Sequence, residues 1–238
     1  MGIDTSLVAS DSMCFCMVDL AKYVGCGLYS LKDAARLLKV KPSTLRYWSG
    51  ELHGAEGIVP RQLEDDRLLT FAELMEFHFV KLFRDHEVSL QAIRKAAKAA
   101  SKKFHTNYPF TVKQFNTDGR SIFVTLHSRE TDKELIEDLQ RGQLVFTKLI
   151  RPFFKKLEFR GTTEAARFWP LQKQGRIVLD PNRRFGQPID ADTGVPTEAL
   201  TRALKAGDGQ SAADVARWFD IPVEAVRAAV RFERSLAT

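Results

Sequence analysis

Cysteine is scarce in this sequence. The 238 residues contain three, Cys14, Cys16 and Cys26, and all of them lie near the N-terminus. Because three cysteines leave at least one unpaired, no disulfide framework is indicated, and a reducing compartment such as the cytoplasm is expected. A structural zinc ion needs four ligands, and this segment supplies no histidine as the fourth, so we predict no metal site there.

Long apolar runs and catalytic motifs are missing as well. No stretch reaches the roughly 18 apolar residues of a membrane span, and no basic residue precedes the first apolar run, as it would in a signal peptide. The five histidines are scattered, and the sequence has no HExxH, GxSxG, Walker or GxGxxG pattern. We therefore expect no enzymatic activity, no cofactor and no membrane association.

Basic residues, by contrast, are in excess. Lys and Arg number 36 against 30 Asp and Glu, which gives a net charge of +6. Residues 29–103 carry 14 basic against 10 acidic side chains, whereas residues 1–28 carry 1 against 3. This balance favours a polyanionic partner, although an ordinary basic soluble protein would have the same composition.

Capping residues predict that residues 29–103 are mainly helical. Ser30 with Asp33, and Thr70 with Glu73, have the spacing of capping boxes, and Ser89 is a further N-cap. Apolar residues recur at helical spacing after each cap, and a proline suits the first turn of another helix. The helices expected here begin near residues 30, 42, 70 and 89.

The pattern changes after residue 104. The segments FTVKQF (110–115) and RSIFVTL (120–126) are joined by NTDG, which predicts a β-hairpin. LVFTKLI and FFKKLEFR are expected as further strands, or the first as a helix end, and ARFWPLQKQG as a linker. Helices are predicted at 132–140, 197–206, 211–219 and 222–235. The fold class is therefore expected to be α+β, mostly α.

The sequence contains an internal repeat. A shift of 181 positions places Ser30 on Ser211 and Ala35 on Ala216, and aligns the apolar turn residue Val40 with Ile221. A cap, a small residue at a helix crossing and an apolar turn are what a helix-turn-helix needs to hold its second helix at a steep angle. We therefore predict one helix-turn-helix near each end of the chain.

The second helix of the first unit carries candidate DNA-binding residues. Arg46 could bind a guanine edge or a phosphate, while Ser43, Thr44 and Tyr47 could donate hydrogen bonds to phosphate oxygens. The alternative is that such helix pairs pack in all-α domains without contacting DNA. In the second unit Glu224 would repel phosphate, so that unit is expected to serve interaction or dimerisation, with DNA binding as the alternative. A homodimer is expected because helix-turn-helix proteins bind paired half-sites.

Residues 29–103 resemble the MerR-type winged helix-turn-helix. The residues that carry the resemblance are YSLKDAARLLKVKPSTLRYW, a wing-like loop, and then RLLTFAELMEFHFVKLFRDHEVSLQAIRKA. The resemblance implies that TLRYW is the recognition helix and that a wing arginine, Arg67 or Arg61, grips the DNA backbone. A predicted hairpin region follows where effector-binding members have a long dimerising helix, so metal or drug sensing is not expected.

The C-terminal part resembles a small domain of unknown function that recurs in bacterial antitoxins. The matching segments are RIVLDPNRRFGQPI, TGVPTEAL and SAADVARWFDIPVEAVRAAVRF. Together the two ends resemble a VapB-type antitoxin of a type II toxin–antitoxin system. The expected organisation is a lead segment at 1–28, the winged helix-turn-helix at 29–103, a small β-containing middle region at 104–172 and a helical, helix-turn-helix-like domain at 173–238.

The resemblance also implies a partner. Such antitoxins silence a PIN-like ribonuclease, whose active site gathers acidic residues around Mg²⁺, and repress their own operon by binding operator DNA. Candidate toxin-binding residues are the loop cations Arg183 and Arg184, which could instead solvate the loop or contact DNA, and the aromatics Phe153, Phe154 and Trp169, which could instead pack in the core. Two alternatives remain: a stand-alone MerR-like transcription regulator, and an interaction adaptor that does not bind DNA.

Overall fold

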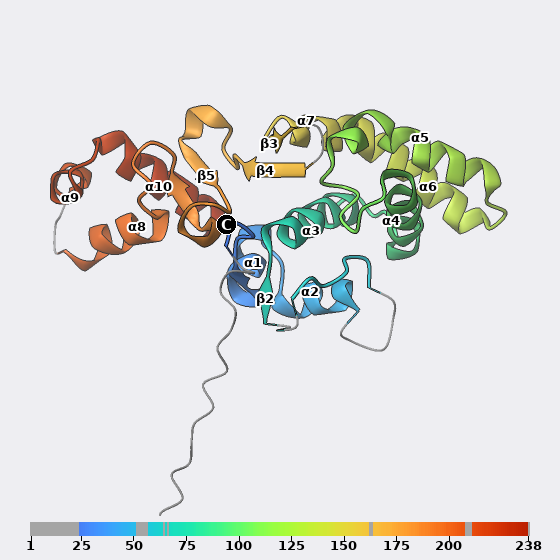
Figure 1. Cartoon of the computed structure of the whole chain (residues 1–238), viewed down its shortest axis with the longest axis horizontal. Helices are drawn as coiled ribbons and strands as arrows, with labels where there is room; N and C mark the ends of the chain where they lie inside the picture. The colour runs from blue at the N-terminus through green and yellow to red at the C-terminus, as the bar shows by residue number, and fades with distance from the viewer. Residues whose placement is uncertain are drawn as a thin grey trace, which may run out of the picture.

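The computed structural model describes residues 24–50, 57–63, 65, 67–161, 164–207 and 211–237. Most of the predicted lead segment 1–28, including Cys14 and Cys16, lies outside these ranges. Three groups of elements follow one another along the longest axis (Figure 1). Helices α8–α10 lie at one end and α4–α6 at the other, while the N-terminal helix-turn-helix, α3 and a small sheet lie between them.

The two helices of the N-terminal unit form where the caps predict, although Ser30 and Asp33 make only one of the two backbone hydrogen bonds of a capping box. β1 (Tyr29–Ser30) pairs with β2 (Leu68–Leu69), and between them lie α1 (Leu31–Leu38) and α2 (Pro42–Ser49). Ser30 caps α1 by accepting a hydrogen bond from the Asp33 amide, and Lys39 ends that helix in the left-handed conformation with φ 53°. These contacts satisfy one free amide at the start of α1 and two free carbonyls at its end.

Two longer helices follow the loop after α2. α3 (Phe71–Arg84) begins with the predicted capping box between Thr70 and Glu73, and α4 (Leu90–Phe104) begins at the predicted cap Ser89. α3 is the central helix, since it packs against α1 on one side and α4 and α6 on the other. Its apolar face therefore joins the helix-turn-helix to the rest of the molecule.

The predicted β-hairpin is wrong. Residues 113–129 form α5 (Lys113–Arg129), and Gly119 of the NTDG segment lies inside this helix. A Cβ atom at Gly119 would lie 2.3 Å from the Phe146 ring, so the glycine allows close helix packing instead of a turn. The buried residues Phe115, Gly119, Ile122 and Phe123 have helical spacing, and this face overrides the local β preference of their neighbours.

The rest of the middle region is also more helical than predicted. α6 (Lys133–Val145) extends beyond the expected 132–140 and continues through a π-helical turn (Phe146–Ile150) into α7 (Arg151–Phe154). Of the two structures expected for LVFTKLI, a strand or a helix end, the helix end is therefore correct. Of the second predicted strand, only its end is extended, as β3 (Leu157–Arg160).

The predicted linker contributes to a sheet. β4 (Glu164–Phe168) pairs antiparallel with β3, and its last residue, Phe168, pairs with Leu179 of β5 (Ile177–Leu179). β6 (Pro188–Asp190) completes the order β3-β4-β5-β6. Residues 177–190 thus supply two strands, β5 and β6, and the sheet connects the middle region to the C-terminal helices.

The C-terminal helices agree with the prediction. α8 (Thr197–Ala206), α9 (Ala212–Phe219) and α10 (Val223–Ala237) lie within two residues of the expected boundaries. α9 and α10 begin 181 positions after α1 and α2, which confirms the second helix-turn-helix unit. The overall class, α+β and mostly α, is confirmed as well.

One apolar core runs through most of the molecule. It extends from Tyr29 to Leu179 and crosses the predicted domain boundary at residue 104. The division of the chain into domains stays a prediction. Eight phenylalanine rings from α3 to α7 contact one another in its middle: Phe79, Phe83, Phe110, Phe115, Phe123, Phe146, Phe153 and Phe154.

Candidate nucleic-acid interface

The packing of α1 fixes the angle of α2. Ala34 and Ala35 are buried at the crossing, and the small side chains let the two helices approach closely. On α2, Leu45 and Trp48 are buried, and the Trp48 ring stacks on Phe77 of α3 with 6.3 Å between ring centroids. α2 is therefore held by its inner face and presents the opposite face outward.

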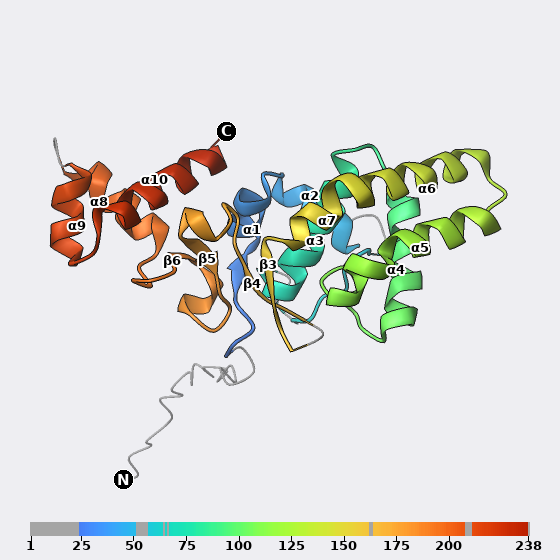
Figure 2. The same cartoon turned by 90° about the horizontal axis from the view of Figure 1, so that it is seen from above.

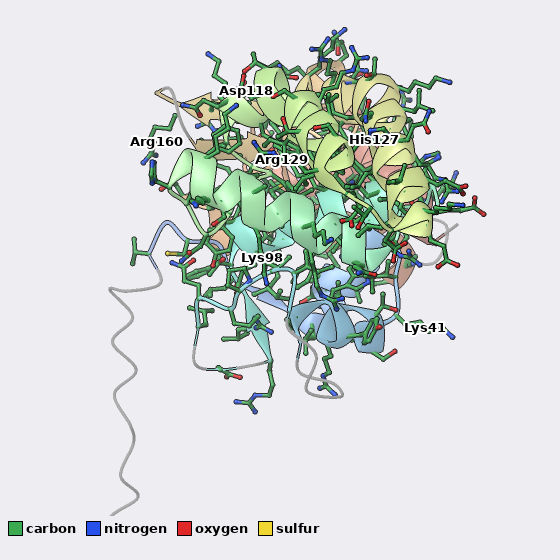
Figure 3. All side chains as sticks on the ribbon, turned by 90° about the vertical axis from the view of Figure 1, so that its right-hand side faces the viewer. Lys41, Lys98, Asp118, His127, Arg129 and Arg160 are labelled. Atoms are coloured by element: carbon green, nitrogen blue, oxygen red, sulfur yellow. The ribbon has the colours of Figure 1, made fainter. Side chains whose placement is uncertain are left out.

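The predicted DNA-binding residues of α2 lie on that outward face. Ser43, Arg46 and Tyr47 are exposed, and Thr44 is half-buried. Lys41 at the N-cap is also exposed, and Figure 3 shows its side chain pointing away from the body of the molecule. α2 contains no acidic residue, so its outer surface combines cations with hydroxyl donors, the groups that bind phosphate and base edges.

The two candidate wing arginines differ in their surroundings. The Arg61 guanidinium lies 3.1 Å from the buried Glu73 carboxylate and donates to the Leu68 carbonyl oxygen, so it holds the wing to α3. Arg67 is 79% exposed and forms a two-pronged ion pair with Asp65, whose pKa is lowered to about 2 by the Arg67 hydrogen bonds. Of the two, Arg67 is the one positioned to reach a phosphate.

The second helix-turn-helix does not present an equivalent face. The residues that correspond to Thr44 and Tyr47 are Ala225 and Ala228, and both are fully buried. Ala228 contacts Ile177 and Phe232 in a small apolar cluster, and α10 packs against α8, β5 and β6. Arg227 corresponds to Arg46 and is exposed, but it lies beside the exposed Glu224. The surface that would enter a groove is mostly covered by the chain itself.

The loop Arg183–Gly186 has a strained backbone. Arg184, Phe185 and Gly186 all have positive φ angles, of 48°, 53° and 81°. The Tyr29 hydroxyl donates to the Gly186 carbonyl at 2.7 Å, and the Leu28 amide donates to the Phe185 carbonyl at 2.8 Å. These bonds hold the loop against the start of the first helix-turn-helix, which is a link that the sequence alone did not predict.

The predicted toxin-binding residues fall into three environments. Arg183 is half-buried and donates to the Ala191 carbonyl at 2.7 Å, whereas Arg184 is exposed. Phe153 and Phe154 are buried in the aromatic core, which was the alternative expected for them, so these two rings do not form a surface for a toxin. Trp169 is half-buried. Arg184 is therefore the candidate best placed to meet a partner.

A second link joins the two ends of the molecule. Arg36 of α1 pairs with Glu233 of α10 at 2.5 Å, and Leu37 packs against an apolar cluster that contains Ala228 and Phe232 of α10. Figure 2 shows the C-terminal end of α10 beside α1. The repeat pattern aligned α1 with α9 but gave no signal that α10 would cover α1.

The described residues contain no cluster of potential metal ligands. Among residues 24–50, 57–63, 65, 67–161, 164–207 and 211–237, no three His, Cys, Asp or Glu side chains are grouped as metal ligands. His78 packs between the Phe153 and Phe168 rings, and burial lowers its pKa to about 3. In the same part of the chain no helix is long and apolar enough to cross a membrane.

Known proteins match both ends of the chain. Residues 29–100 match the MerR HTH family of regulatory proteins, and residues 177–232 match the protein of unknown function DUF433. The chain thus has a MerR-type helix-turn-helix domain at its N-terminus and a DUF433 domain at its C-terminus. The predicted resemblance of both regions is confirmed.

One curated protein and one solved structure span most of the chain. The chain is 24% identical over 200 residues to the "Putative antitoxin VapB45" of Mycobacterium tuberculosis, across 76% of this chain and 83% of that protein. It also shares the fold of the X-ray crystal structure of Rv2018 from Mycobacterium tuberculosis, with a TM-score of 0.69 and 22% identity. That alignment covers 87% of this chain and 98% of the other.

Proposed function

We propose that this chain, in which a MerR-type helix-turn-helix precedes a DUF433 domain, is an antitoxin. It binds and neutralises a PIN-like ribonuclease and represses its own operon by binding operator DNA. The likeness to an antitoxin over three quarters of the chain supports the first activity. The exposed, acid-free outer face of α2 is the observation that carries the second. Both activities place the protein in the cytoplasm.

In this proposal α2 enters the major groove. Arg46 contacts a guanine edge or phosphate, Ser43 and Tyr47 contact phosphate oxygens, and Arg67 holds the backbone from the wing. Thr44, which is half-buried, would donate from the edge of the face. Since such proteins bind paired half-sites, we propose that the chain acts as a homodimer.

Arg46→Ala tests the DNA contact, with Arg227→Ala as a matched control. Arg46→Ala should weaken operator binding by roughly 1–3 kcal/mol if the guanidinium contacts a base. Arg227→Ala removes the same charge from the second helix-turn-helix unit and should leave the operator affinity close to that of the wild type. Gel-shift midpoints at several salt concentrations measure both effects, and an unchanged midpoint for Arg46→Ala would refute the assignment.

Co-expression tests the toxin-binding activity. The full-length chain should rescue cells that express the ribonuclease gene beside its own, and the two proteins should purify together. Operator binding without rescue would instead support the stand-alone regulator. Rescue without operator binding would show that the helix-turn-helix serves only protein interaction.

A further inference from the structure

The end of α9 exposes two aromatic rings. Trp218 is 72% exposed and Phe219 is 37% exposed, and their ring centroids lie 6.2 Å apart. The chain has three tryptophans, and Trp48 is buried while Trp169 is half-buried. An exposed tryptophan on a well-formed helix is costly in water and is a common anchor of protein interfaces.

The first repeat shows what covers this position. Trp218 corresponds to Leu37, and Arg217 corresponds to Arg36. In the first repeat Arg36 pairs with Glu233 at 2.5 Å, and Leu37 packs, as Leu236 does, against the apolar cluster of Ile177, Ala228 and Phe232. Both positions of α1 are therefore partly covered by one face of α10, and the Arg36 side chain keeps 36% of its surface exposed. That face has an apolar residue, an acidic residue directly after it, and a second apolar residue four positions after the first.

The corresponding positions of α9 are open. Arg217 is 78% exposed and pairs with Asp214 of its own helix, itself 45% exposed. The backbone of the two units is the same, because both first helices end in a left-handed residue whose amide donates to the same two carbonyls. The difference thus lies in what covers the helix and not in how it folds.

We infer that the Arg217–Trp218 face of α9 is a docking site for an amphipathic helix of the ribonuclease toxin. That helix would carry two apolar residues, four positions apart, that pack against Trp218. An acidic residue between them would form an ion pair with Arg217. This inference rests on the proposed function and adds to it the surface and the kind of element that meet. A second copy of the chain is a poorer fit, because Glu233 of each α10 already pairs with Arg36 and accepts a hydrogen bond from Thr197.

Binding of the purified full-length chain to the purified ribonuclease of the neighbouring gene tests this site. Trp218→Ala should weaken binding at least 30-fold, which corresponds to the roughly 2 kcal/mol lost at an interface hot spot. Arg217→Glu should weaken it about tenfold or more, through repulsion of the acidic residue. Leu144→Ala removes another exposed apolar side chain, 57% exposed on α6, and should bind as the wild type does.

The outcomes separate the two proposals. If the wild-type chain does not bind the nuclease at all, the proposed function falls. If the wild type binds and Trp218→Ala binds equally well, the docking site is wrong while the antitoxin assignment stands. Loss of binding by Arg184→Ala but not by Trp218→Ala would also overturn the site, since it would place the contact on the strained loop. Unchanged operator affinity of each variant shows that its fold is intact.

Discussion

The two helix-turn-helix units of this chain have the same backbone and different surroundings. In both, a serine accepts a hydrogen bond from the amide of an aspartate three residues later, and both first helices have eight residues. Both turns contain an αL residue, Lys39 or Asp220, with φ 53°. The next amide, that of Val40 or Ile221, donates to the carbonyl of the small crossing residue at 3.0 or 2.9 Å.

The units differ in their second helices. α2 has eight residues and stops at Gly50, which adopts φ 85°, whereas α10 has fifteen residues and continues through the corresponding Arg231. The longer helix covers apolar surface on two sides, against α8 with the sheet and against α1. The same turn therefore supports a largely exposed second helix in one unit and a largely buried one in the other. The elements that pack on the second helix, more than the motif itself, decide which unit has a surface accessible to DNA.

Exchanging the side chains of the corresponding residues Tyr47 and Ala228 should give the largest difference in stability between the two units. Ala228→Tyr puts at the buried position of α10 the side chain that α2 carries at Tyr47. Because Ala228 is fully buried beside Ile177 and Phe232, a ring there should overpack the cluster and destabilise the fold by roughly 1–3 kcal/mol. Tyr47→Ala should change stability by no more than about 0.5 kcal/mol, because its ring is partly solvated. Thermal unfolding measures both.

The control is Arg227→Tyr, one residue away on the exposed side of α10. It adds the same ring without entering the core and should leave the unfolding temperature nearly unchanged. An Ala228→Tyr protein as stable as the wild type would mean that the second unit is open, and the contrast between the copies would be lost.

The local chemistry of both units could be predicted from the sequence. Serine caps, a small crossing residue and an apolar turn residue act within a dozen positions, so their pattern is visible in the chain. The helix at 113–129 could not be predicted in the same way. Its Gly119 lies against the Phe146 ring, 27 positions away, and a glycine after Asn-Thr-Asp has the local signature of a turn.

The candidate site shows the same limit. That Ser43, Arg46 and Tyr47 would share the outer face of α2 followed from helical spacing, and the structure places them there. That Arg61 would be bound to Glu73 did not follow, because a single sequence carries no signal for a contact across twelve positions between a loop and a helix. Burial of the second unit could not be predicted either, because it depends on how α8 and the sheet pack against α10 in the folded protein.

Removing the caps should test the similarity of the two units. Ser30→Ala and Ser211→Ala each remove the hydroxyl that accepts from the helix, at 3.1 Å from the Asp33 amide and 3.3 Å from the Asp214 amide. Each should cost roughly 0.5–2 kcal/mol of stability. Chemical denaturation should give similar losses, and Ser30→Thr and Ser211→Thr should restore most of them.

A loss at only one of the two positions would contradict the equivalence of the caps. The double variant Ser30→Ala/Ser211→Ala provides a further check. The two serines lie in separate contact networks, so their free-energy changes should add to within about 0.5 kcal/mol.

The smallest expected difference concerns the turn residues Lys39 and Asp220. Both adopt the left-handed conformation, which glycine adopts without strain, so Lys39→Gly and Asp220→Gly should each stabilise the protein by roughly 0.5 kcal/mol. Backbone strain and charge contribute differently at the two positions. Lysine is strained there but suits the negative end of the helix dipole, whereas aspartate tolerates the conformation better and carries the unfavourable charge.

Salt distinguishes these two contributions. Screening weakens the interaction of an exposed charge with the helix end. The gain from Asp220→Gly should therefore fall as salt rises, because part of it comes from removing an unfavourable charge. The gain from Lys39→Gly should rise, because less favourable charge is lost. Denaturation at about 0.05 and 0.5 M salt would reveal opposite slopes, and parallel slopes would mean that backbone strain alone sets both changes.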